Sequence, residues 1–125
     1  MKIIIDGYNL LPRMNIKGVS LEEKRNNMIE QLKEFLDVNK AEMTVVFDGT
    51  RQESLHRGAE KRGLIKLIFS ARGETADEVI VELIKNRTGK AREHMDVTSD
   101  NRIIKAVSEL SVKHMKSEDF AVYFE

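Results

Sequence analysis

The stretch KIIIDGYNLL, residues 2–11, carries the strongest local signal in this chain. Its three consecutive isoleucines are β-branched and apolar, so they predict a buried strand over residues 2–6. Asp6 ends this apolar run. Gly7 follows it, and because glycine has no Cβ, the backbone can turn sharply there and a ligand can approach. The stretch therefore predicts a buried strand that ends in a polar turn open to a ligand.

Strand-like and helix-like segments alternate along the rest of the chain. Short apolar, β-branched runs predict four further strands, over residues 43–47, 64–69, 95–98 and 111–115. Capping signals and helical spacing predict three helices, from Ser20 to about Asn39, from Thr75 to about Asn86, and over residues 101–110. The polar and basic residues 49–63 are expected to form a long connection. The tail, residues 117–125, fits either a helix or an edge strand.

This alternation implies right-handed crossovers between parallel strands, with helices covering both faces of the sheet. We therefore predict an α/β fold: a three-layer α/β/α sandwich around a five-stranded parallel sheet. The chain has 125 residues, which is the length of one domain, so we expect a single domain over residues 1–125. A composition of 41% hydrophobic and 34% charged residues indicates a globular protein rather than a disordered one.

Composition also limits the classes of function. The chain contains no cysteine, which excludes disulfides and thiolate zinc sites and favours a reducing, cytoplasmic location. No apolar run reaches the ~20 residues of a membrane span, so no membrane partner is expected. The net charge is +0, but basic residues gather in two segments, residues 51–72 and 85–92. Each of these segments is either a phosphate-binding surface or a solvated face.

Three aspartates stand where predicted strands end: Asp6, Asp48 and Asp100. The carboxyl ends of parallel strands share one edge of a sheet, so these side chains can meet there. Clustered carboxylates are costly unless a cation neutralises them, which indicates a divalent-metal site. A fourth acid, Asp77, begins a predicted helix, where the helix dipole alone could explain it. Asp100 has a similar alternative as a helix N-cap.

Two residues beside Asp6 also have alternative interpretations. Asn9 supplies a neutral amide that can orient a water or a phosphate, or it can simply occupy a left-handed turn position. Tyr8 can stack on an unpaired base, or it can pack against a loop. The sequence leaves both choices open.

Four motifs in this order resemble NYN domains, which are PIN-like metal-dependent ribonucleases, and within them the YacP-like group. The motifs are DGYN at residues 6–9, FDG at 47–49, ETADE at 74–78 and TSD at 98–100. The resemblance runs from residue 2 to about residue 115. It implies a PIN-like sheet of strand order 3-2-1-4-5, Mg²⁺ or Mn²⁺ as cofactor, and endonucleolytic cleavage of RNA. It also implies a metal-binding catalytic quartet with Asn9 beside it, namely Asp6, Asp48, Asp77 and Asp100.

The expected substrate is single-stranded RNA, on the ribosome or elsewhere, and a homodimer is left open. The candidate RNA contacts are Tyr8, Arg51, Arg57, Lys61, Arg62 and Arg72. No histidine is needed as a base, and His56, His94 and His114 are expected at the surface or at strand edges. The main alternative is a non-catalytic RNA- or ribosome-binding module of the same fold. A PIN-class toxin shares the same chemistry, and a receiver-type signalling domain fits the acid pattern poorly.

Overall fold

The computed structural model describes residues 1–49 and 57–125, and its central element is a six-stranded sheet of order β3-β4-β2-β1-β5-β6. The central strand is β1 (Lys2–Asp6), which pairs in parallel with β2 (Glu42–Phe47) and with β5 (His94–Val97). Beyond these lie β4 (Ile65–Phe69) and β6 (Lys113–Met115), again in parallel. The five predicted strands therefore have the predicted order.

The sixth strand corrects the prediction for residues 49–63. Within that expected connection, β3 (Gly58–Arg62) pairs antiparallel with β4 through a turn at Gly63, whose φ is +60°. The sequence of β3, GAEKR, has no apolar pattern, and most of its residues are exposed. Its backbone hydrogen bonds to the edge of β4 hold it in place, a long-range cause that local composition does not reveal. The sheet is thus mixed rather than wholly parallel.

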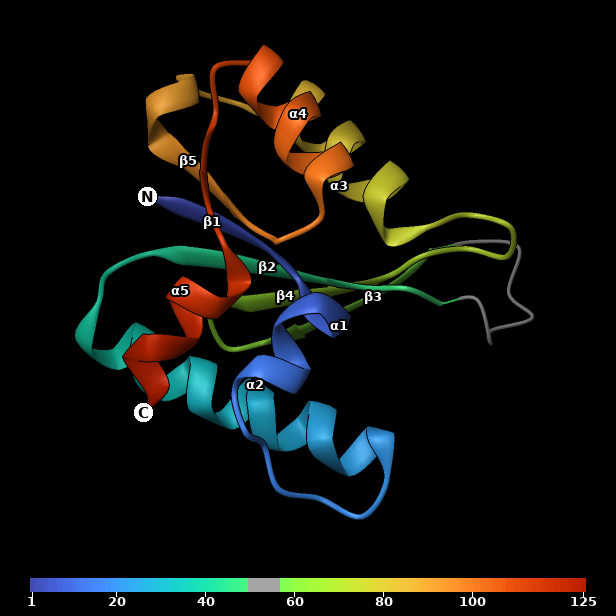
Figure 1. Ribbon diagram of the computed structural model, residues 1–125, viewed down its shortest axis with the longest axis vertical. Coiled ribbons are helices and arrows are strands. Elements are labelled where there is room, and N and C mark those ends of the chain that lie inside the picture. Colours follow the sequence, from blue (N-terminus) through green and yellow to red (C-terminus); the bar gives the residue numbers. More distant parts are fainter. Residues whose placement is uncertain (50–56) are drawn as a thin grey trace.

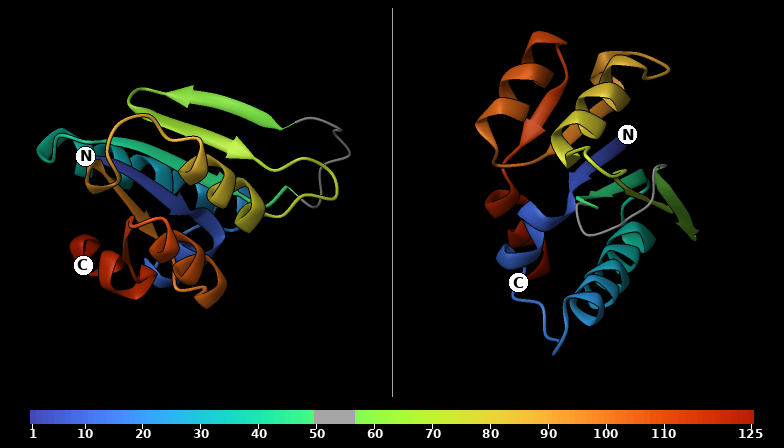
Figure 2. Two further views of the ribbon diagram at one scale, coloured as in Figure 1. Left: turned by 90° about the horizontal axis from the view of Figure 1, so that it is seen from above. Right: turned by 90° about the vertical axis from the view of Figure 1, so that its right-hand side faces the viewer.

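Helices cover both faces of the sheet, which confirms the three-layer sandwich (Figures 1 and 2). One face carries α1 (Gly7–Leu10), the long α2 (Leu21–Val38) and α5 (Ser117–Ala121). The other face carries α3 (Ala76–Lys85) and α4 (Asn101–Glu109). Three short 3₁₀ turns complete the described elements: η1 (Leu11–Arg13), η2 (Ala91–Glu93) and η3 (Val122–Phe124). The tail is therefore helical, which decides between its two expected conformations.

The run of isoleucines supplies both hydrophobic cores, because successive side chains of a strand point to opposite faces. Ile3 and Ile5 pack into the cluster beneath α2 and α5, together with residues such as Leu32. Ile4 packs into the cluster beneath α3 and α4, together with residues such as Ile80. A strand buried on both faces can thus lie at the centre of the sheet, and its carboxyl end lies between the two helical layers.

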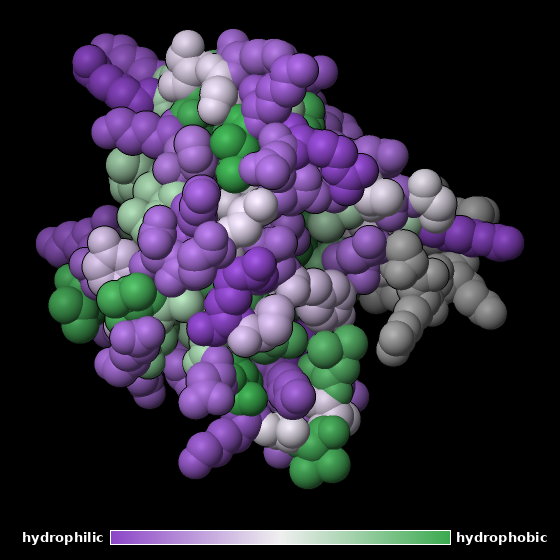
Figure 3. Space-filling model, viewed as in Figure 1, coloured by the Kyte–Doolittle hydropathy of each residue, from purple (hydrophilic) through white to green (hydrophobic). Residues whose placement is uncertain are grey.

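The face shown in Figure 3 is largely hydrophilic, with scattered apolar side chains. Across residues 1–49 and 57–125, no helix is long and apolar enough to cross a membrane.

Candidate active site

Asp6 is the most buried of the predicted site acids, at the carboxyl end of β1. Its side chain is 9% exposed and accepts a 3.2 Å hydrogen bond from the hydroxyl of Thr98, with a further one from the backbone N–H of Asn9. Burial raises the pKa of Asp6 to about 6; the Thr98 hydrogen bond opposes this shift, and the charges of Asp77 and Asp100 add to it. Asp77 and Asp100 therefore lie near enough to Asp6 for their charges to act on its pKa.

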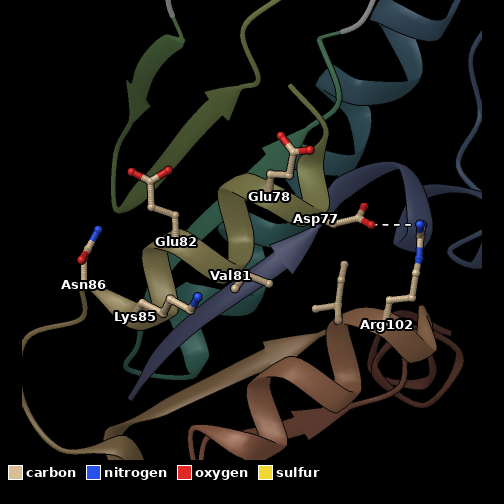
Figure 4. A pocket seen from close by; sticks show the side chains of 8 residues that line it. Asp77, Glu78, Val81, Glu82, Lys85, Asn86 and Arg102 are labelled. Carbon is tan, nitrogen blue, oxygen red and sulfur yellow. Dashed lines mark ion pairs between the residues drawn. The ribbon is translucent and has the colours of Figure 1, made fainter. Parts of the chain in front are cut away.

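Asp77 and Asp100 both form an ion pair with the same side chain, the guanidinium of Arg102. The Nη2 atom of Arg102 lies 3.0 Å from Asp77 Oδ2 and 3.2 Å from Asp100 Oδ2; Figure 4 shows Arg102 facing Asp77. Hydrogen bonds from Arg102 are the main cause that lowers the pKa of Asp100, and the two aspartates raise the pKa of Arg102. Arg102 was not among the predicted site residues. The only signal in the sequence was its position two residues after Asp100.

Asp100 serves a structural purpose as well. It is the N-cap of α4, and its side chain accepts a 2.9 Å hydrogen bond from the backbone N–H of Arg102. Asp77 lies in the first turn of α3, two residues after the N-cap Thr75. Each acid thus has the helix-terminus role that the sequence left open, and each also lies near Asp6. The two interpretations are compatible, because an N-cap carboxylate still presents oxygen atoms to solvent.

Asp48 lies where β2 and β4 end. It is half-buried, and its Oδ1 accepts a 3.4 Å hydrogen bond from the hydroxyl of Ser70. The same hydroxyl oxygen accepts a 2.7 Å hydrogen bond from the backbone N–H of Gly49. The structure thus anchors Asp48 on the β2 side of the site, and its role as a metal ligand stays a prediction.

The two glycines that follow strand-end acids are required by close packing. A Cβ on Gly49 would lie 2.2 Å from the backbone oxygen of Ser70, and a Cβ on Gly7 would lie 2.5 Å from the ring of Phe47. The sequence led us to expect that a ligand approaches the backbone at Gly7. The Phe47 ring fills this space, because the carboxyl ends of neighbouring strands converge there.

Asn9 holds three parts of the chain together. Its amide oxygen accepts a 2.9 Å hydrogen bond from the backbone N–H of Ser99 and a 2.7 Å one from the hydroxyl of Ser117, which is fully buried. Asn9 belongs to the helical turn α1 and is not in a left-handed conformation. Its oxygen therefore positions the turn that contains Ser99 and Asp100, and the role of Asn9 beside a metal stays a prediction.

Glu118 extends this network towards solvent. It accepts hydrogen bonds from the hydroxyl of Ser99 at 2.6 Å and from Arg13 Nε at 3.1 Å, and the Ser99 bond is the main cause that lowers its pKa. Ser99, Ser117 and Glu118 were not predicted as site residues. Nothing in the local sequence indicates that α5 returns to the end of β1.

A second buried acid, also not predicted, lies beneath the site. Asp96 is in β5 opposite Ile4 and is 0% exposed, and neither of its oxygens makes a well-formed hydrogen bond with a residue that the structure describes. Burial, followed by the charge of Asp6, raises the pKa of Asp96 to about 8, and the backbone N–H of Val97 opposes the shift. Asp96 is therefore mainly protonated at neutral pH. From the sequence, Asp96 was predicted to lie in a strand and was given no role in the site.

Two of the candidate RNA contacts are engaged within the protein. Tyr8 packs on Phe47, with ring centroids 5.0 Å apart, and its hydroxyl accepts a 2.9 Å hydrogen bond from Arg25. Arg57 binds Glu74 through several hydrogen bonds, the shortest of them 2.7 Å, and also pairs with Glu82. Tyr8 thus adopts the packing alternative, and the charge of Arg57 is balanced by acids of the α3 region.

The other candidate contacts differ in exposure. Arg62 bonds to Glu60 and to Asn26 of α2. Lys61 and Arg72 are exposed and form no ion pair with another residue in the described part of the chain. Arg51 lies outside the described residues.

The prediction for one of the three histidines, His94, was wrong. His94 is only 3% exposed, and its Nε2 lies 2.8 Å from the carbonyl oxygen of Thr88. It begins β5, an interior strand, which explains why it is neither at the surface nor at a sheet edge. His114 is exposed on the edge strand β6, as expected, and His56 lies outside the described residues.

The donor chemistry of the site suits a hard divalent cation, because Mg²⁺ and Mn²⁺ prefer carboxylate oxygens. Arg102 already places one positive charge between Asp77 and Asp100. However, within residues 1–49 and 57–125, no three carboxylates or imidazoles lie close enough to hold one ion. The acids therefore fit a cation by type and by charge, but their side chains are not gathered around one point.

A groove of about 530 Å³ runs between α3 and α4 and ends at Asp77 and Arg102 (Figure 4). Val81 and Ile103 give it an apolar lining. Of the predicted site acids, only Asp77 lines this groove.

The mostly parallel sheet, with helices on both faces and acids at the carboxyl ends of its strands, places the chain among α/β domains. The family model described as "YacP-like NYN domain" matches residues 3–125, and the chain belongs to this family. The uncharacterized protein YacP of Bacillus subtilis (strain 168) is 31% identical over 105 residues, which cover 78% of this chain and 59% of that relative. The chain thus spans less than two-thirds of the length of this relative.

Solved structures show the same fold. A crystal structure of Rae1 (YacP) from Bacillus subtilis, a point mutant, matches with a TM-score of 0.79 and 24% identity, covering 98% of this chain and 74% of that chain. A second crystal structure of Rae1 (YacP) matches with a TM-score of 0.77 and 23% identity, covering 99% and 73% of the two chains. The predicted family and fold class are confirmed.

Proposed function

We propose that this chain is a metal-dependent endoribonuclease that hydrolyses phosphodiester bonds of single-stranded RNA. The observation that carries the proposal is that Asp6, Asp77 and Asp100 are linked at one edge of the sheet. The Thr98 hydroxyl donates to Asp6 and accepts from the backbone N–H of Asp100, and Arg102 bridges Asp100 and Asp77. Membership of the YacP-like NYN family also supports the proposal, because the resemblance to NYN domains implies metal-dependent ribonuclease activity.

In this proposal Asp6, Asp77 and Asp100 hold Mg²⁺ or Mn²⁺, with Asp48 at the border of the site. When bound, such an ion lowers the pKa of an attacking water and neutralises charge on the scissile phosphate. Thr98 and the backbone of Asn9 keep the Asp6 carboxylate in place through their hydrogen bonds. Hydrolysis by water leaves a 5′-phosphate and a 3′-hydroxyl.

RNA binding in this proposal rests on a few exposed cations. Lys61 and Arg72 are exposed, whereas Arg57 is paired with acids. With a net charge of +0, the protein gains little long-range attraction for RNA, so binding is expected to be weak and to depend on salt. The cellular setting that we propose is the cytoplasm, either at the ribosome or away from it.

The competing function is an RNA- or ribosome-binding module without catalysis. Two observations favour it: Arg102 already pairs with Asp77 and Asp100, and no three acids of the described residues are close enough to hold one ion. Under this alternative the protein retains RNA at low salt and releases no products with any divalent ion.

The deciding experiment is cleavage of a labelled single-stranded RNA in Mn²⁺ by the wild type, by Asp6→Asn, and by the control Asp37→Asn. Asp37 is an exposed acid of α2, so its replacement removes one charge far from the acid cluster. We expect cleavage by the wild type and the control, none by Asp6→Asn, and none in excess EDTA, with unchanged circular dichroism. Activity that persists in Asp6→Asn or in EDTA would contradict the proposal.

A further inference from the structure

Arg102 occupies a position that helix stability does not favour. It lies in the first turn of α4, directly after Asn101, where the helix dipole disfavours a positive charge. Its side chain is 81% exposed and does not pack into the core. A purely structural reason for an arginine here is therefore weak, because an exposed ion pair contributes at most about 1 kcal/mol.

What distinguishes Arg102 is that its guanidinium serves two carboxylates on different helices. The same Nη2 atom lies 3.0 Å from Asp77 of α3 and 3.2 Å from Asp100 at the start of α4. These are two of the oxygen donors that the proposed function assigns to the metal. A divalent cation and this guanidinium therefore compete for the same carboxylates.

An arginine displaced from these acids would stay at the end of the groove between α3 and α4, beside the acid cluster (Figure 4). A guanidinium presents a planar set of donors that suits a phosphate oxygen as well as a carboxylate. Because the side chain is exposed, it can turn from one partner to the other without unpacking the core.

We infer that Arg102 is a displaceable counter-cation: it holds Asp77 and Asp100 while no metal is bound, and it binds a phosphodiester oxygen of RNA once those carboxylates turn to the metal. This inference rests on the proposed function. Phosphate and metal each favour the released state of Arg102, so each strengthens the binding of the other.

The test compares Arg102→Gln with Lys105→Gln. Lys105 is exposed on the same helix, so its variant loses the same charge without touching the acid pair. Mn²⁺ is titrated without RNA, with free Mn²⁺ followed by electron paramagnetic resonance. We expect Arg102→Gln to bind Mn²⁺ at least about fivefold more tightly than the wild type, at the lower end of typical coupling between sites. Lys105→Gln is expected to stay within about twofold of the wild type, because Lys105 forms no ion pair with Asp77 or Asp100 and its exposed charge is partly screened.

Two further measurements test the phosphate contact. In Mn²⁺, Arg102→Gln should raise the KM for single-stranded RNA at least about tenfold, the cost of one charge-assisted hydrogen bond. In EDTA, its RNA affinity should match that of the wild type, because Arg102 is then held by the acids. Arg102→Lys keeps the charge but not the planar fork, so its Mn²⁺ affinity should lie between those of the wild type and Arg102→Gln.

Equal Mn²⁺ affinity in Arg102→Gln and Lys105→Gln would overturn the inference, and so would an unchanged KM. If the wild type still binds Mn²⁺ and cleaves RNA, such a result overturns the inference alone. Failure of the wild type to bind Mn²⁺ or to cleave RNA would overturn the proposed function and this inference with it.

Discussion

The hydroxyl of Ser117 donates a 2.7 Å hydrogen bond to the amide oxygen of Asn9, across 108 positions of the sequence. The backbone N–H of Ser99 donates to the same oxygen at 2.9 Å. One amide group thus fixes the turn after β1, the turn after β5 and the start of α5 relative to one another. The position of Asp100, next to Ser99, depends on this junction.

We predict that Asn9→Ala destabilises the protein by about 1–3 kcal/mol, because it leaves two hydrogen-bond donors without their acceptor. Urea unfolding followed by circular dichroism measures the change. Asn101→Ala is the control, since Asn101 is an exposed residue at the start of α4. Equal stability of the two variants would show that the junction contributes little.

A second prediction concerns Gly49. A Cβ at this position would lie 2.2 Å from the backbone oxygen of Ser70, so Gly49→Ala must separate the ends of β2 and β4. We expect a loss of about 2–4 kcal/mol in the free energy of unfolding, within the range for a forced backbone shift. Gly63→Ala has open space but a φ of +60°, and it should cost only about 1 kcal/mol. A Gly49→Ala protein as stable as Gly63→Ala would contradict this packing argument.

The sequence predicted those parts of the fold that rest on local patterns. The isoleucines at residues 3–5 predicted a buried strand, and Ser20 and Thr75 were predicted to cap helices. The structure confirms these predictions. Strand β3 could not be predicted, because its residues gain stability only from pairing with the edge of β4.

The site was predictable to a similar extent. Asp6 and Asp100 end apolar runs and were identified for that reason. Arg102 and Ser117 could not be identified, because their roles depend on contacts between distant segments. Asp96 stands inside a strand, where nothing in the local pattern indicates that it is buried without a hydrogen-bond partner.

Asp96 gives a prediction about pH. Its pKa rises from the ordinary value of 3.8 to about 8 in the folded protein, mainly through burial. Between these values the folded protein keeps a proton that the unfolded chain has lost, so stability falls as the pH rises. The same sign holds for Asp6, whose pKa is raised to about 6, so of these two acids Asp96 contributes more to the pH dependence in the window from pH 6 to pH 8.

In that window we expect the free energy of unfolding to fall by about 1 kcal/mol per pH unit in the wild type. Asp96→Asn should flatten this dependence and be more stable than the wild type at pH 8. Asp37→Asn, which changes an exposed acid, should keep the wild-type slope. Parallel curves for Asp96→Asn and the wild type, measured by urea unfolding at several pH values, would refute the assignment.

The two arginines at the candidate RNA surface should behave differently. Arg57 is bound by Glu74 and Glu82, so Arg57→Gln should lower stability by about 1 kcal/mol and leave RNA affinity nearly unchanged. Arg72 is exposed and forms no ion pair with another described residue, so Arg72→Gln should weaken RNA binding and reduce the salt slope by about 1. Fluorescence anisotropy in EDTA at several salt concentrations separates the two cases. A larger loss of RNA affinity in Arg57→Gln than in Arg72→Gln would contradict this assignment.

The central claim is that Asp6, Asp77 and Asp100 form one metal site at the carboxyl edge of the sheet. Diffraction from a crystal soaked in Mn²⁺, with data collected at the manganese absorption edge, tests this claim most directly. We predict an anomalous peak among these three carboxylates, with Arg102 turned away from Asp77. A fully soaked crystal without a peak at these residues, or with its main peak elsewhere, would contradict it.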